Sequence, residues 1–212
     1  MNQSIKALRQ RAGPFPTRYA VRLAGLALAY FLAARLGLEY AVTNPVISTV
    51  WPASGIALAA VLLGGLRLLP AVFIGAFAVN YSIQTSMAGS SITALGTSLE
   101  VLLGTLLLRR VLDFDARVSR LRDAVCLIVV TATIAPLPAA LLGPLSLALS
   151  GGMAWPDLFH AFRAWWMGDS LGIVLIAPLL LTWAAKPVLD WRSPRCWHVA
   201  KIGRASVGKE CA

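Results

Sequence analysis

Apolar runs alternate with short polar breaks along most of this chain. Between residues 19 and 183, stretches rich in Leu, Ala, Val and Ile are separated by turns that contain Gly, Pro or charged residues. These stretches are apolar on all sides, unlike the surface helices of soluble proteins. A helix of about 20 such residues crosses a hydrocarbon core of about 30 Å. We therefore predict an all-α membrane protein, a bundle of about six transmembrane helices. The predicted spans are residues 19–38, 46–64, 69–83, 92–108, 124–150 and 161–183.

The second span is the unusual one. A helix that begins at Pro52 would reach the next turn after about 13 residues, or about 20 Å, which is too short for a crossing. Residues from Val46 onward must then share it. Proline followed by Ser54 and Gly55 predicts a helix broken near Pro52, which a membrane tolerates only where protein or a cavity satisfies the freed backbone groups. We therefore predict a binding site here that includes Trp51.

Three segments carry a family resemblance: WPASGIALAAVLLGG at 51–65, RLLPAVFIGAFAVN at 67–80 and WWMGDSLGIVLIAPLLLTW at 165–183. In this order and spacing they resemble the MASE1 domain, a bacterial membrane-embedded sensor region that is N-terminal to the output domains of histidine kinases and cyclic-di-GMP enzymes. The resemblance covers residues 19–183 and implies a sensor of two-component or cyclic-di-GMP signalling. The residues that match its motifs are Pro52, Gly55, Gly75, Asn80, Gly168, Asp169, Gly172 and Pro178.

Two carboxyl groups lie inside apolar spans, on Glu100 and Asp169. A charged side chain there costs at least about 2.5 kcal/mol on insertion scales, so it usually faces the bundle interior and marks a ligand site, a proton site or an ion pair. Arg35 and Arg163 are the candidate partners for an ion pair. The indole of Trp166 could stack on a ligand, and it fits an interfacial aromatic belt as well. The complete candidate ligand site is Trp51, Pro52, Ser54, Gly55, Asn80, Glu100, Trp166 and Asp169.

The basic charge follows the predicted topology. The chain has 212 residues, 58% of them hydrophobic, and a formal net charge of +10, with a mean hydropathy of +0.74. If the N-terminus is inside, every Lys and Arg except Arg35 and Arg163 falls on the inner side. The positive-inside rule therefore predicts that both termini are cytoplasmic. The charge then needs no nucleic-acid partner, and we expect a multi-pass protein of the bacterial cytoplasmic (inner) membrane.

Three parts follow from this topology: a basic cytoplasmic leader at 1–18, a membrane-embedded domain at 19–184, and a basic cytoplasmic tail at 185–212. The tail is shorter than the roughly 50 residues of the smallest domains, so we expect no output domain in it. Family members usually continue into further helices and an output domain. We therefore expect either a truncated gene product or a sensor that acts through a separate kinase or cyclase.

The sequence gives no sign of catalysis, a metal or a cofactor. His160 and His198 lie on opposite sides of the predicted membrane, and Cys196 with His198 lacks a second pair of ligands. Residues 203–209 have the spacing of a phosphate-binding loop, but Glu210 follows where a Ser or Thr would hold magnesium. We therefore expect a protein that is not an enzyme.

The leading hypothesis is a sensory input module whose helix packing around the second span and Asp169 changes with an unidentified ligand or membrane condition. The alternative is a six-helix solute-binding subunit of a transporter, because broken helices are recurrent transporter sites. An intramembrane enzyme has only the two carboxyl groups in its favour. A stripe of small residues in the first span predicts close packing inside the bundle or, alternatively, a homodimer face. The stripe consists of Gly25, Ala29, Ala33 and Gly37.

Overall fold

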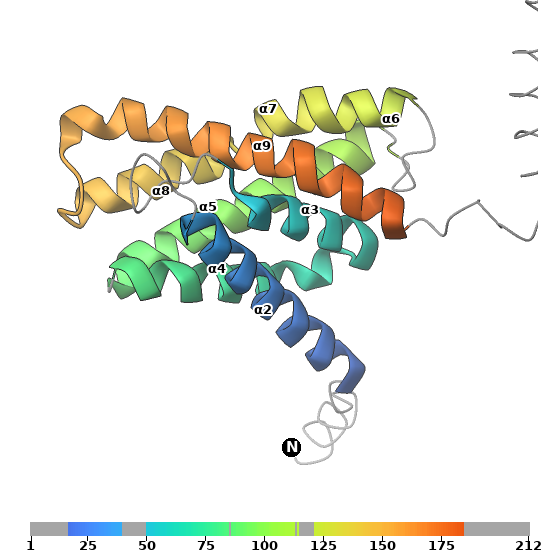
Figure 1. Ribbon diagram of the computed structural model, residues 1–212, viewed down its shortest axis with the longest axis horizontal. Coiled ribbons are helices and arrows are strands. Elements are labelled where there is room, and N and C mark those ends of the chain that lie inside the picture. Colours follow the sequence, from blue (N-terminus) through green and yellow to red (C-terminus); the bar gives the residue numbers. More distant parts are fainter. Residues whose placement is uncertain (1–16, 40–49, 85, 113, 115–120, 185–212) are drawn as a thin grey trace, which may run out of the picture.

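The computed structural model describes residues 17–39, 50–84, 86–112, 114 and 121–184, and within these ranges the chain is helical and contains no strand (Figure 1). The all-α prediction is confirmed. The predicted basic leader, the loop before Val50 and the basic tail with its phosphate-loop-like segment lie outside the described residues, apart from Thr17 and Arg18 at the end of the leader. The longer helices are α2 (Thr17–Glu39), α3 (Pro52–Gly64), α4 (Leu69–Gln84), α5 (Met87–Leu106), α8 (Leu137–Leu149) and α9 (Leu158–Ala184).

Five helical segments are long and apolar enough to cross a membrane, and α3 is the short exception. Large apolar side chains cover their outer surfaces. On α2, for example, Leu28, Leu32 and Leu36 lie one turn apart and are all more than half exposed. Such a surface is costly in water and suits a lipid environment. The described chain therefore forms the predicted bundle of six helical rods.

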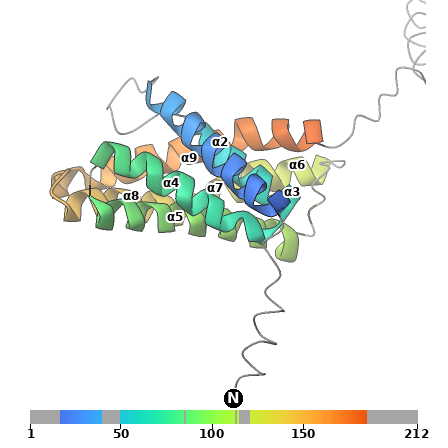
Figure 2. The same cartoon turned by 90° about the horizontal axis from the view of Figure 1, so that it is seen from below.

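The rods pack in a closed ring. α2 packs against α4, α4 against α5, α5 against α8, α8 against α9, α9 against α3, and α3 against α2 again. α3 also contacts α5 across the ring, so it is the most central helix (Figure 1). Figure 2 shows α2 crossing α4 obliquely on one side of the bundle. The inner faces of α2, α3, α5 and α9 therefore approach one another.

The short helix α3 begins at Pro52, as the sequence predicts. Trp51 before it has the non-helical torsions φ −109° and ψ 86°, and proline occupies the first helical position, where its missing N–H costs little. The helix has 13 residues. Whether residues 46–49 share the crossing stays a prediction, because they lie outside the described residues.

The boundary between α4 and α5 differs from the prediction. The predicted spans 69–83 and 92–108 leave a loop that reaches Ser91, but α4 continues to Gln84 and α5 begins at Met87. The hydroxyl of Ser86 accepts a hydrogen bond from the backbone N–H of Gly89 at 3.2 Å and thereby caps the helix. The small polar residues after Ser86 belong to this helix, and two of them, Ser90 and Thr93, are buried against the bundle.

The fifth rod, which we predicted as one long span at 124–150, is irregular. It consists of α6 (Leu121–Val125), the π-helical turn η3 (Cys126–Thr131), α7 (Ala132–Ile134) and, after a turn at Ala135 and Pro136, α8. Proline has no N–H for the carbonyl four residues earlier, so it frees the carbonyl of Ala132.

The small-residue stripe on α2 is divided between two environments. Ala33 and Gly37 are buried, and Gly37 packs against Trp51 and Pro52. Gly25 and Ala29 are exposed. Internal packing therefore accounts for the second half of the stripe, and a homodimer face at the first half stays a prediction.

Candidate functional site

The start of α3 lies directly against the middle of α9. The backbone N–H of Trp51 donates a hydrogen bond to the carbonyl of Gly168 at 2.9 Å. The hydroxyl of Ser54 donates to Oδ1 of Asp169 at 2.7 Å. Both Ser54 and Asp169 are buried. Two segments more than a hundred residues apart in sequence thus meet through one backbone and one side-chain hydrogen bond.

Two glycines make this close approach sterically feasible. A Cβ atom added to Gly172 would overlap the carbonyl of Trp51, and one added to Gly55 would overlap the carbonyl of Gly172. The obstacles are backbone atoms, which cannot move aside as a flexible side chain can. A side chain at either position would therefore separate α3 from α9 and break the contact between Ser54 and Asp169.

The two predicted carboxyl groups face the same interior. Glu100 on α5 is 1% exposed and Asp169 is 2% exposed. They lie close enough for the charge of Asp169 to act on Glu100, which also lies near the hydroxyl of Ser54. Both oxygens of Glu100 and Oδ2 of Asp169 have no hydrogen-bond partner in the described structure. Buried polar atoms without partners are rare and call for an explanation.

The predicted ion pairs with arginine do not form among the described residues. Arg35 and Arg163 are both exposed. The guanidinium of Arg163 lies over the ring of Phe159, 5.9 Å from its centroid, instead of near Asp169. The carboxyl groups are therefore not neutralised by these side chains.

Tyr30 on α2 completes the buried group, and our sequence analysis missed it. It is 1% exposed, and its hydroxyl accepts a hydrogen bond from the indole nitrogen of Trp51 at 3.2 Å. Tyr30 also lies near Thr97 and within electrostatic reach of both carboxyl groups. A phenol in the middle of an apolar span is the signal that could have found it.

The other two predicted site residues have different contacts. Asn80 is buried on α4, and its side-chain amide donates to the carbonyl of Ala76 in its own helix at 2.8 Å. The indole nitrogen of Trp166 donates to the carbonyl of Thr133 at 2.9 Å. Next to it, Ser170 donates to the carbonyl of Ala132 at 2.5 Å, the group that Pro136 frees. Trp166 therefore lies beside the break between α7 and α8.

The sequence profile of the MASE1 family matches residues 22–210 of the chain. The chain belongs to the MASE1 family. The match continues beyond Trp183, where the resemblance described above ends. No curated protein and no solved structure matches it significantly. MASE1 domains are membrane-integral sensory domains, so the chain is a multi-pass membrane protein that carries a sensory domain.

The carboxyl pair of this MASE1 domain lies deep in the bundle. Asp169 is about 16 Å along α9 from its start at Leu158, at about 1.5 Å per residue. The remainder of the helix, to Ala184, extends about 22 Å further. Asp169 therefore lies in the middle third of α9, away from both ends of the helix, and the start of α3 packs beside this part of it.

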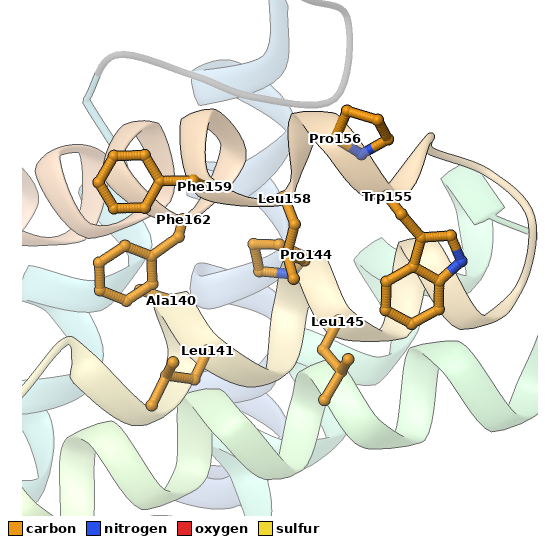
Figure 3. A pocket seen from close by; sticks show the side chains of 9 residues that line it. All are labelled: Ala140, Leu141, Pro144, Leu145, Trp155, Pro156, Leu158, Phe159 and Phe162. Carbon is orange, nitrogen blue, oxygen red and sulfur yellow. The ribbon is translucent and has the colours of Figure 1, made fainter.

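A separate cavity lies between α8 and the first turns of α9 (Figure 3). Its volume is about 510 Å³, and Trp155, Phe159, Phe162 and neighbouring Pro, Leu and Ala side chains line it. It contains none of the carboxyl groups. Its surface suits an apolar chain, whereas the interior around Glu100 and Asp169 suits a polar or charged ligand.

Proposed function

We propose that this MASE1 chain is the sensory input module of a signalling system in the bacterial cytoplasmic membrane. A ligand or membrane condition acts at the contact between α3 and α9, and the response reaches a histidine kinase or a cyclic-di-GMP enzyme. The observation that carries the proposal is the hydrogen bond between Ser54 and Asp169. It joins the early and late motifs of the family at a buried polar site, which is an expensive arrangement to maintain without a use.

Helix α9 provides the route to the output. It runs without interruption from Leu158 to Ala184 and contains Asp169 somewhat before its midpoint. Pro178 lies in the part of the helix beyond Asp169 and has no N–H for the carbonyl of Val174, but the helix continues through it to Ala184. We infer that a shift at Asp169 is passed along this continuous helix. In the predicted topology this helix ends at the cytoplasmic face, where a separate kinase or cyclase, or a further domain, would receive the change.

The alternative function is the solute-binding subunit of a transporter. The feature that favours it is α3, a helix of 13 residues whose N-terminus lies inside the bundle beside two carboxyl groups. Helix ends of this kind form substrate and ion sites in transporters. Uptake of a solute that depends on the chain, together with an ATPase subunit bound to it, would favour this alternative.

The test is complementation in the bacterium of origin. In a strain lacking the gene, we would measure cyclic-di-GMP and the phosphorylation of response regulators, with wild type, Asp169→Asn or Asp157→Asn restored. Asp157 is the matched control because it is exposed in the turn before α9. We expect wild type and Asp157→Asn to restore the signal and Asp169→Asn to fail at equal membrane abundance. Unchanged signals on deletion would contradict the sensor, and equal behaviour of the two variants would remove Asp169 from its site.

A further inference from the structure

We propose that Glu100 and Asp169 bind a monovalent alkali cation of the size of Na⁺, and that this cation is the ligand of the sensor. The second clause rests on the proposed function, whereas binding itself does not. The starting observation is that both oxygens of Glu100 and Oδ2 of Asp169 are buried without a partner in the described structure. A bound ion gives these oxygens the partners that the protein does not provide.

Five side chains near this point offer oxygen atoms as ligands. Asp169 comes from α9, Glu100 from α5 and the hydroxyl of Ser54 from α3. The hydroxyls of Tyr30 on α2 and Thr97 on α5 lie at the edge of the same group. Hard cations prefer such oxygen ligands, whereas transition metals prefer nitrogen and sulfur. The described residues contain no group of three His, Cys, Asp or Glu side chains that could hold a metal ion. Hydroxyl groups must therefore share the coordination.

The balance of charge favours a single positive charge. Asp169 accepts the hydroxyl hydrogen of Ser54 in the first turn of α3, where the N-terminal end of the helix dipole stabilises a negative charge. Glu100 has no comparable support. Tyr30 is the other titratable side chain that faces the pair, since the described α3 and α5 carry no further charged residue and the arginines of α2 and α9 are exposed or lie at the helix ends. One monovalent cation compensates the remaining negative charge, that of Glu100.

Cation binding would link three helices. Without the ion, no hydrogen bond in the described structure holds the unpartnered oxygens of Glu100 on α5 and Asp169 on α9. With the ion, both carboxyl groups are drawn to the same point, which tightens the contact between α3 and α9. Binding of the ion would thereby change how α3 packs against α9, the helix proposed to carry the signal to the output.

The experiment measures ion-dependent stability of the full chain, purified in detergent. Thermal unfolding is recorded at constant pH and ionic strength while NaCl replaces choline chloride. We expect a saturable rise in Tm with Na⁺ for wild type that is lost in Glu100→Gln and Asp169→Asn. Glu39→Gln is the control, because Glu39 is exposed at the end of α2, and it should retain the wild-type rise. Binding of ²²Na⁺ to wild type, competed by unlabelled Na⁺, tests the site without any variant and is expected to saturate near one ion per chain.

Three results would overturn the proposal: equal Tm in choline and Na⁺, an equal Na⁺ effect in Glu100→Gln and wild type, or a response to pH alone with no saturable ²²Na⁺ binding. Failure of the ion site is distinguishable from failure of the sensor. Signalling that depends on Asp169 without Na⁺ binding overturns the cation alone. Na⁺ binding in a chain whose deletion changes no signal overturns its role as the ligand and the sensor together.

Discussion

Ser54 is the residue through which α3 reaches Asp169, and its removal should be measurable. Ser54→Ala leaves Oδ1 of Asp169 without the hydroxyl that now lies at 2.7 Å. Because the carboxyl group stays buried, we expect a loss of about 1 to 2 kcal/mol in the free energy of unfolding, at the upper end for hydrogen bonds between membrane helices. Thermal or denaturant unfolding in detergent measures this loss.

The matched control is Ser98→Ala. Ser98 lies on α5 and donates to the carbonyl of Ala94 in its own helix at 2.8 Å, so its removal breaks no contact between helices. We expect a change within about 0.5 kcal/mol. A loss for Ser98→Ala as large as that for Ser54→Ala would mean that the hydrogen bond to Asp169 contributes nothing specific.

At this scale the sequence predicted the costly residues but not their partners. Glu100 and Asp169 could be found because a carboxyl group in an apolar span is conspicuous. Ser54 and Gly55 could be found because they follow a proline in a short span. The hydrogen bond from Trp51 to Tyr30 could not, since it joins two spans whose relative rotation no pattern specifies. The contact of Trp166 with Thr133 depends in the same way on where α7 ends.

Among the elements, lengths and breaks were more predictable than ends. The start of α3 at Pro52 and the kink of the fifth rod follow from proline chemistry. The early start of α5 was missed because Ser and Gly after Ser86 are typical of a loop, whereas inside a bundle small residues allow helices to pack closely. The π-helical turns η2 (Leu107–Val111) and η3 have no sequence signal that we recognised.

The crossing of α3 and α9 should fail when a methyl group is added to it. In Gly172→Ala the new Cβ meets the carbonyl of Trp51, so the two helices must separate. We expect a loss of about 1 to 3 kcal/mol in the free energy of unfolding, as for overpacked cores. Unfolding in detergent, or the yield of folded protein, reports this loss.

Gly25→Ala provides the comparison for this variant. Gly25 also lies inside a helix, yet an added Cβ finds nothing within 4 Å. Alanine is favoured over glycine in a helix interior by about 0.5 to 1 kcal/mol, so this variant should be neutral or more stable. If Gly172→Ala proved as stable as Gly25→Ala, the close approach of α3 to α9 would be contradicted.

For the whole molecule, the number of helices was predictable and their arrangement was not. The spans are apolar on all faces, so no amphipathic stripe indicates which side meets a neighbour. The ring order, in which α3 lies between α2 and α9, had no counterpart in the sequence analysis. The ring nevertheless explains the candidate site, because it turns Tyr30, Glu100 and Asp169 toward one interior.

The predicted orientation of the bundle can be tested by chemical labelling at two exposed positions, Asp157 and Arg67. Tyr19 at the start of α2 donates to the carbonyl of Arg67 between α3 and α4, and Arg109 beyond α5 donates to the carbonyl of Leu62. These contacts gather basic residues at one end of the bundle, which the positive-inside rule places in the cytoplasm.

In a chain whose native cysteines are replaced by serine, we expect Asp157→Cys to react with a membrane-impermeant maleimide in intact cells. Arg67→Cys should react only after permeabilisation. The reverse pattern would direct the end of α9 away from the cytoplasm and would contradict the proposed route to a kinase or cyclase.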